Sequence, residues 1–234
     1  RRYLSYFQEK GLPSLDKVMV NDARAFIINA SKSMSAGSLH NLLCYVRQFH
    51  VFLRNTAEEA PDCISLFSYH VPREMPVRGY VTDDELAAIM EQIDTSTDEG
   101  KRDKAIISLG ATTGLRAIDI VKLKLTDIDW LRGEIHVTQS KTEGVLYLPL
   151  LPETGEAIKD YILNARPKTD IQEIFLREKA PFIAMSSGVA ICYLFDSYSR
   201  KAGIERSPFD GKGFHGLRRR LARNMLVTGT PVTT

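Results

Sequence analysis

The chain has 234 residues, of which 44% are hydrophobic and 26% are charged, and its formal net charge is +2 at pH 7. This composition is typical of a soluble globular protein with one large domain or two smaller ones. No apolar run is long enough to cross a membrane, and no signal peptide is visible. Three widely spaced cysteines, Cys44, Cys63 and Cys192, support neither a disulfide framework nor a zinc site. We therefore expect a cytoplasmic protein.

The charge is distributed unevenly along the chain. From Lys201 onward there are seven Lys or Arg residues and two acidic residues, a local net charge of +5 that leaves −3 on the rest. A basic patch on a nearly neutral protein indicates contact with a polyanion, and a solvated basic helix is the simpler alternative. Because the chain begins at Arg1 and stops inside the run TGTPVTT, we expect it to be part of a longer protein.

The first part of the chain predicts short helices. One runs from Arg1 to Lys10, and Asn21 or Asp22 caps a second. A longer helix from Leu39 to about Arg54 is predicted by apolar residues at helical spacing, namely Leu39, Leu42, Leu43, Val46, Phe49 and Leu53. Beside this stripe lies a basic edge that contacts either DNA or solvent and consists of His40, Arg47 and Arg54.

A domain boundary is expected at Pro72 to Gly79, where two prolines and a glycine break the helical periodicity. We place a linker there, between domains 1–74 and 75–234. Directly after it, Thr82 and Glu85 have the spacing of a capping box, which predicts a helix to about Ile93.

The second domain is predicted to be mainly helical with a small antiparallel sheet, so the fold class is mainly α with an α+β catalytic part. Two strands, 134–139 and 145–150, are joined by a hairpin turn, and 182–185 is a further short strand. The expected helices are 101–112, 115–123, 152 to about 162, and 189–201.

A basic helix is predicted over 213–226, GFHGLRRRLARNML. One face can be buried because apolar residues recur every four positions, at Leu217, Leu221 and Met225. His215 and Arg218 are three apart and therefore neighbours on another face, where an imidazole beside a guanidinium suits phosphate oxygens. The remaining arginines of the run are expected to contact DNA, namely Arg219, Arg220 and Arg223.

Two further basic residues precede this helix. Arg116 follows Gly114 and begins a helix, where free backbone N–H groups favour anions. Asp119, one turn later, is placed to hold the Arg116 guanidinium. Lys141 lies at the tip of the predicted hairpin. Taken singly, such an Arg–Asp pair is more often structural and a hairpin lysine is more often solvated.

In combination, these residues resemble the tyrosine recombinase (phage integrase) family of site-specific DNA recombinases. TTGLRAIDIVKLKLTDID is similar to the first arginine box of the family, with Arg116 at a catalytic position and Asp119 supporting it. Lys141 stands where the family has its hairpin lysine, and HGLRRRLARNMLVTGTP is similar to the second box, with His215 and Arg218 at catalytic positions.

The likeness covers nearly the whole chain, because the first domain resembles the helical core-binding domain. It departs from the family at Arg220, where Ser or Thr is frequent, and at Arg223, where a small polar residue is frequent.

The resemblance implies strand cleavage and rejoining through a 3′-phosphotyrosyl intermediate, without metal or cofactor. The two arginines would stabilise charge on the phosphate, Lys141 would protonate the 5′ oxygen, and His215 would bind the phosphate or take the nucleophile's proton. None of the nine tyrosines stands in the family's nucleophile context, so we expect the nucleophile beyond Thr234 and no covalent chemistry from this stretch alone. Tyr193 and Tyr198 are interpreted as packing residues.

The resemblance also implies partners: double-stranded DNA clamped by both domains, and a homo-tetramer on paired DNA sites, with no membrane role.

Several alternatives remain open on the sequence. A type IB topoisomerase would use the same chemistry to relax supercoils. A non-catalytic DNA-binding regulator would use the arginines only to grip phosphate, and a helical protein with a basic patch would not bind DNA. A metal nuclease would need acidic ligands, for which Asp127 and Asp129 are the only tempting pair. Asp in such a turn more commonly caps backbone N–H groups.

Overall fold

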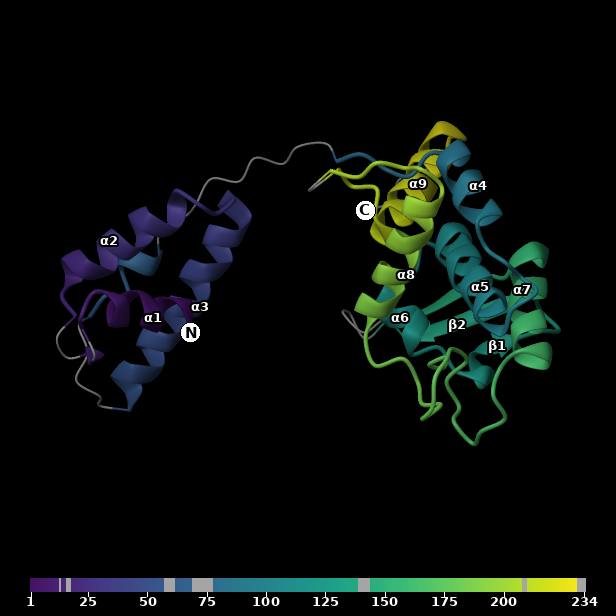
Figure 1. Cartoon of the computed structure of the whole chain (residues 1–234), viewed down its shortest axis with the longest axis horizontal. Helices are drawn as coiled ribbons and strands as arrows, with labels where there is room; N and C mark the ends of the chain where they lie inside the picture. Colours follow the sequence, from purple (N-terminus) through teal and green to yellow (C-terminus); the bar gives the residue numbers. More distant parts are fainter. Residues whose placement is uncertain are drawn as a thin grey trace. The chain divides into compact units, whose positions relative to one another are not determined.

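The computed structural model describes residues 1–12, 14–15, 18–56, 62–68, 78–138, 144–207 and 210–230. The chain divides into two compact units, Arg1–Pro76 and Val77–Thr234, which are called unit 1 and unit 2 below. Figure 1 shows the elements of each. Most of the expected linker lies outside the described residues. Only its last two residues, Arg78 and Gly79, are described. In the described parts, no helix is both long and apolar enough to cross a membrane.

Unit 1 is helical, as the sequence predicted. Its elements are α1 (Arg2–Glu9), α2 (Val20–Ser31), α3 (Ala36–Asn55) and a 3₁₀ turn (Leu66–Ser68). Aromatic rings fill its core: Tyr3 packs edge to face on both Phe7 and Phe26. The Tyr3 hydroxyl also lies 2.8 Å from Nε2 of the buried His50. This pair places a polar bond inside an otherwise apolar core.

The helix starts in unit 1 differ from those expected. Helix α2 begins at Val20 rather than after Asn21 or Asp22, because the Asp22 carboxylate accepts the N–H of Met19 at 2.9 Å from inside the first turn. Helix α3 begins at Ala36, three residues before Leu39, because the Ser35 hydroxyl caps the N–H of Ser38.

Unit 2 is built around α5 (Asp98–Thr113), which is buried along most of its length and contacts both α7 and α9. Helix α4 (Asp83–Glu91) begins with the predicted capping box, in which Glu85 accepts from the N–H of Thr82 and Thr82 from that of Glu85. The remaining helices are α6 (Ala117–Val121), α7 (Pro152–Asn164), α8 (Gly188–Lys201) and α9 (Phe214–Val227). Helix α6 is shorter than the expected 115–123.

The described sheet has three antiparallel strands in the order β1–β2–β3. Strands β2 (Glu134–Thr138) and β3 (Val145–Pro149) are the two that the sequence predicted, paired with Ile135 opposite Leu148. The two-residue strand β1 (Ile128–Asp129) was not predicted. The expected strand at 182–185 is wrong, because only Ala184 pairs, in an isolated bridge with Leu176.

Candidate active site

The first turn of α9 is seated on α5 through a glycine. Phe214 is 4% exposed, and its ring occupies the space in which a side chain on Gly110 would stand: a Cβ there would lie 2.4 Å from the ring. The ring also packs edge to face on Phe195 of α8, with centroids 5.8 Å apart. Leu217, one turn later, is fully buried. These contacts fix the N-terminal half of α9, which carries His215 and Arg218.

The apolar face of α9 is shorter than expected. Leu217 is buried and Leu221 is half-buried, whereas Met225 is 46% exposed. The predicted periodicity of four is present, but the described part of unit 2 does not cover the last turn. The interpretation of Met225 as a core residue is therefore wrong.

Arg218 is held against the turn between α5 and α6. That turn contains Gly114, whose φ of 63° places it in the left-handed region that favours glycine at a helix C-terminus. The Arg218 Nη1 donates a hydrogen bond of 2.9 Å to the Gly114 carbonyl. The contact spans 104 residues of sequence and brings the second predicted arginine beside the turn from which Arg116 emerges.

Arg116 is held by a buried carboxylate. It is the residue directly before α6, and its Nη1 lies 3.8 Å from Oδ2 of Asp119, whose side chain is 1% exposed. Asp119 is thus within ion-pair distance of the Arg116 guanidinium, and its supporting role stays a prediction. Arg116 Nη1 is buried and makes no hydrogen bond with any described residue, so its contact with Asp119 is an ion pair without a hydrogen bond.

His215 is solvent-accessible and surrounded by positive charge. Partial burial lowers its pKa below the ordinary value, and the guanidinium groups of Arg219, Arg218, Arg116 and Arg78 lower it further. Both effects favour the neutral form of the imidazole. It can accept a proton or a hydrogen bond.

Three of the predicted site residues are thus brought together: Arg116, His215 and Arg218. The charge of Arg78 joins them, and the sequence interpretation missed this residue because it lies in the segment treated as a linker. Lys141 lies outside the described residues. The last described pair before it is Thr138 with Val145, so its position stays a prediction.

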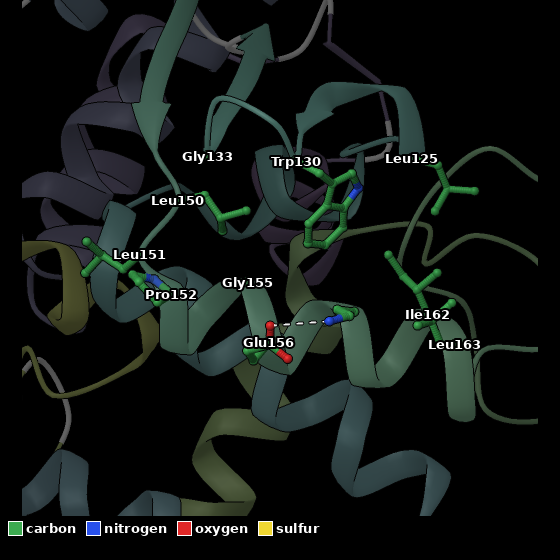
Figure 2. Close-up of a pocket in the computed structure, with 11 residues that line it drawn as sticks. Leu125, Trp130, Gly133, Leu150, Leu151, Pro152, Gly155, Glu156, Ile162 and Leu163 are labelled. Atoms are coloured by element: carbon green, nitrogen blue, oxygen red, sulfur yellow. Dashed lines mark hydrogen bonds and ion pairs between the residues drawn. The ribbon is translucent and has the colours of Figure 1, made fainter.

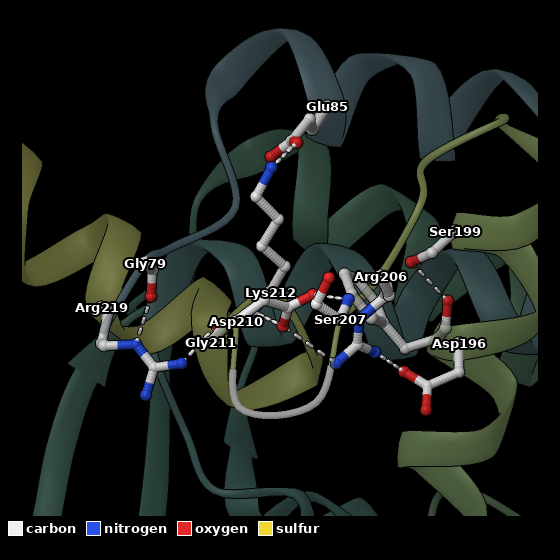
Figure 3. A network of polar contacts seen from close by, with 11 residues as sticks. Gly79, Glu85, Asp196, Ser199, Arg206, Ser207, Asp210, Gly211, Lys212 and Arg219 are labelled. Carbon is white, nitrogen blue, oxygen red and sulfur yellow. Dashed lines mark hydrogen bonds and ion pairs between the residues drawn. The ribbon is translucent and has the colours of Figure 1, made fainter. Parts of the chain in front are cut away.

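The other three arginines of α9 have partners within unit 2 (Figure 3 shows those of Arg219). Arg219 donates to the carbonyls of Gly79 and Gly211. Arg220 pairs with Asp83, and the guanidinium of Arg223 lies 5.1 Å from the centre of the Tyr80 ring. Their expected contacts with DNA stay predictions, and each has a structural use in addition.

The basic edge predicted in unit 1 lies on α3. Arg47 and Arg54 are exposed, whereas His40 is half-buried, with Nε2 3.5 Å from the Cys44 Sγ. DNA contact by these residues is untested by the structure of unit 1 alone.

The two aspartates considered as metal ligands have structural uses. Asp127 accepts the N–H of Lys124 at 2.8 Å, and Asp129 accepts those of Leu131 and Arg132 at 3.1 and 3.0 Å. Their interpretation as backbone caps is confirmed. No group of three or more His, Cys, Asp or Glu residues suited to a metal ion occurs among the described residues.

The tyrosines of α8 differ in environment. The Tyr198 hydroxyl donates to the buried Asp103 at 3.0 Å. Burial and the Asp103 charge raise the pKa of Tyr198 above its ordinary value, which makes it a poor nucleophile. Its predicted packing role fits, whereas Tyr193 on the same helix is 72% exposed and does not pack.

Unit 2 also has an apolar hollow of about 650 Å³ beside α7 (Figure 2). Trp130, Leu125, Leu150 and Ile162 line it, and the Glu156–Lys159 ion pair of 3.5 Å crosses its rim. Of the predicted catalytic residues that the structure describes, Arg116, His215 and Arg218, none lines it. An apolar surface does not suit a phosphodiester, so this hollow is no part of the candidate site.

Comparisons with known proteins identify the class to which this fold and this arginine–histidine cluster belong. The model of the Phage integrase family matches residues 79–234. The chain belongs to the phage integrase family, the tyrosine recombinases, as its motifs predicted.

Individual relatives agree. The protein named Putative integrase/recombinase y4rA, from Sinorhizobium fredii (strain NBRC 101917 / NGR234), is 30% identical over 98% of this chain and 55% of its own length. The chain thus spans about half the length of that relative. A Tyrosine recombinase XerD from Staphylococcus epidermidis (strain ATCC 12228 / FDA PCI 1200) is 24% identical over 98% of the chain and 76% of its own length.

Solved structures confirm the expected fold. A crystal structure of a lambda integrase (75–356) dimer bound to a COC′ core site has a TM-score of 0.69, at 19% identity, over 97% of this chain and 79% of that one. XerH site-specific recombinase bound to difH substrate gives 0.70, at 17% identity, over 98% and 67%. The helical unit and the α+β unit are therefore those of a tyrosine recombinase fold.

Proposed function

We propose that this chain supplies the DNA-binding unit and most of the catalytic unit of a site-specific recombinase that cuts and rejoins DNA through a 3′-phosphotyrosyl intermediate. The observation that carries the proposal is the docking of α9 on the α5–α6 turn. It places Arg218 against Gly114, beside the turn that leads to Arg116, and brings both guanidinium charges near His215. Such a cluster of fixed donors suits a phosphate whose charge increases in the transition state.

Each residue has a distinct role in this proposal. Arg116, braced by Asp119, and Arg218 donate to the non-bridging oxygens of the scissile phosphate. Lys141 protonates the departing 5′ oxygen, because an alkoxide is a poor leaving group at neutral pH. The neutral His215 accepts the proton of the nucleophile or binds the phosphate. The nucleophile is a tyrosine that follows Thr234 in the complete protein.

The bond changes in this step are balanced without a cofactor. The tyrosine oxygen forms a bond to phosphorus as the bond from phosphorus to the 5′ oxygen breaks, and a second DNA 5′ hydroxyl reverses the exchange. One phosphoester bond forms for each one that breaks, so the phosphotyrosyl link retains the energy needed for rejoining. This account supports recombination without nucleotide hydrolysis.

The assembly of the complex is also a proposal. Unit 1 and unit 2 would hold the DNA duplex from two sides, and several copies would join on paired sites. Relatives of this fold have been solved as a lambda integrase dimer on a core site and as a lambda integrase tetramer bound to a Holliday junction. A homo-tetramer on DNA is the assembly that we expect for this chain.

The function is tested on the chain extended to its natural C-terminus. A DNA substrate from the flanks of the gene, nicked near the cleavage position so that the cut fragment is lost, should trap a covalent protein–DNA adduct on a denaturing gel. Adducts on random DNA, with relaxation of plasmid at no preferred site, would indicate a topoisomerase instead. DNA binding without any adduct would indicate a regulator, and the catalytic assignments above would then be wrong.

The DNA contact that we propose for α3 leads to a second prediction. Replacing both Arg47 and Arg54 with alanine should weaken DNA binding by about 3- to 10-fold. The negative slope of log K against log salt should become less steep by about 2, because two phosphate contacts are lost. Arg24→Ala, an exposed arginine on α2, is the matched control and should change neither. A loss for Arg24→Ala half as large, on a logarithmic scale, as that of the double variant would mean that only the net charge of unit 1 matters. Binding isotherms at four salt concentrations measure both quantities.

A further inference from the structure

Residues 79–85, which we name the strap, run from near the start of unit 2 into the first turn of α4. They contact α9, which carries His215 and Arg218, and the loop that leads into α9. The strap is fastened at four points. Arg219 Nε donates to the Gly79 carbonyl at 2.8 Å, and Lys212 Nζ lies 2.5 Å from Glu85 Oε1 (Figure 3). Further along α9, Arg220 and Arg223 meet Asp83 and Tyr80.

The strap also approaches the α8–α9 loop at backbone distance. A Cβ added at Gly79 would lie 2.6 Å from the Asp210 carbonyl oxygen, and one added at Gly211 would lie 2.3 Å from the Gly79 carbonyl oxygen. A Cβ at Gly216 would lie 3.0 Å from the buried Val81 of the strap. Glycines therefore allow the strap, the loop and the first turn of α9 to lie in direct contact.

Arg219 joins these three segments with a single side chain. Its Nε bonds the strap at Gly79, while its Nη2 donates to the Gly211 carbonyl in the loop that leads into α9. The two donors belong to one planar fork, so the two carbonyls are held at a fixed separation. A flexible ammonium could not bond both in this geometry.

We propose that Arg219 is a positioning residue for strand cleavage, which ties the strap to the α8–α9 loop and so fixes the first turn of α9 with His215 and Arg218. The inference rests on the proposed function for its effect on the reaction. It adds a structural role to the expected DNA contact of Arg219, since two of its donors are directed to backbone carbonyls of unit 2.

The strap follows the boundary between the two units, which lies at Pro76 and Val77. Any force that unit 1 exerts on unit 2 through the chain reaches the strap first. Arg219 connects that segment to the catalytic helix.

The decisive variants separate charge from geometry. Arg219→Lys keeps the positive charge but not the fork, and Arg219→Gln loses both. Gly79→Ala keeps every charge but forces the strap away from Asp210. The matched control is Arg200→Lys on α8, an exposed arginine whose Nε donates to the Asp196 carbonyl and which has no part in the strap or the proposed site. All are made in the chain extended to its natural C-terminus.

We expect Arg219→Lys, Arg219→Gln and Gly79→Ala each to slow single-turnover cleavage of saturating nicked DNA by about 10- to 100-fold, because a small displacement of catalytic groups is costly. The DNA dissociation constant should change less than about 3-fold, since phosphate contacts are distributed over both units. The control Arg200→Lys should cleave at nearly the wild-type rate.

A readout independent of activity is hydrogen exchange in the free protein. The two Arg219 variants should accelerate exchange of the backbone amides of 80–86 and 214–217, while α7 stays protected. The proposal would be overturned if Arg219→Lys cleaved at the wild-type rate. It would also be overturned if weaker DNA binding accounted for the whole loss of cleavage in the Arg219 variants. Unchanged exchange would overturn it even if the wild-type chain forms no adduct, so its failure is distinguishable from failure of the proposed function.

Discussion

Arg218→Ala is expected to lower the rate of adduct formation by about 10²- to 10³-fold or more, the loss typical for one donor to a transition-state oxyanion. DNA affinity should fall only a few-fold, because the remaining phosphate contacts are untouched. The measurement is single-turnover trapping on the nicked substrate, with the dissociation constant taken from binding isotherms at the same salt concentration. Arg116→Ala should behave in the same way.

Arg218 also bonds the Gly114 carbonyl, so its removal has a structural component that must be separated. Arg218→Lys keeps a positive charge at the site but lacks the planar fork that carbonyl and phosphate share. We expect it to regain little of the rate, while thermal unfolding shows whether α9 remains docked. Adduct formation by Arg218→Ala at the wild-type rate would show that the phosphate is held elsewhere. The assignment of both arginines would then be wrong.

Local signals in the sequence were enough to predict most helices. The Thr82 and Glu85 capping box predicts the start of α4, and Pro152 at the first position predicts the start of α7. These signals work because a cap is satisfied within four residues of itself. Helix α2 starts earlier than expected because Asp22 acts from the third helical position, a geometry that the sequence does not distinguish from a cap at Asp22.

Features that depend on distant neighbours were not predictable in this way. Strand β1 has only two residues, too few for an alternating pattern, and exists because Ile128 pairs with Ile135. Conversely, the apolar stretch at 182–185 has the composition of a strand but only one paired residue. A strand is stabilised by its partner, so composition alone overestimates strands at such places.

In the candidate site, too, local motifs could be read from the sequence but contacts between distant residues could not. The order and spacing of Arg116, His215 and Arg218 were sufficient to name them, because each belongs to a local motif. Their mutual placement depends on a contact between Gly114 and Arg218 that no local pattern contains. Likewise, the neighbouring arginines 219 and 220 look alike in the sequence. Only the fold shows that Arg219 donates to two backbone carbonyls, whereas Arg220 forms an ion pair with Asp83.

Phe214→Ala is expected to destabilise unit 2 by about 3–5 kcal/mol, the usual cost of removing a large buried ring and leaving a cavity. Phe214 is 4% exposed and fills the space above Gly110, where α9 meets α5. The loss should appear as a lower urea midpoint followed by the fluorescence of Trp130, the single tryptophan, which lies in unit 2. Phe182→Ala removes the same ring from a position that is 41% exposed and serves as the control.

The same substitution separates docking of α9 from folding of the rest. Under conditions where Phe214→Ala is still mostly folded, we expect cleavage to be lost by about 10²-fold, since His215 and Arg218 follow directly on the displaced residue. Phe214→Leu refills part of the space and should recover both stability and rate together. Loss of less than about 1 kcal/mol, or full cleavage by the alanine variant, would mean that α9 is held by Leu217 and the strap rather than by the ring on Gly110. His215 and Arg218 would then owe their position to polar contacts more than to the core.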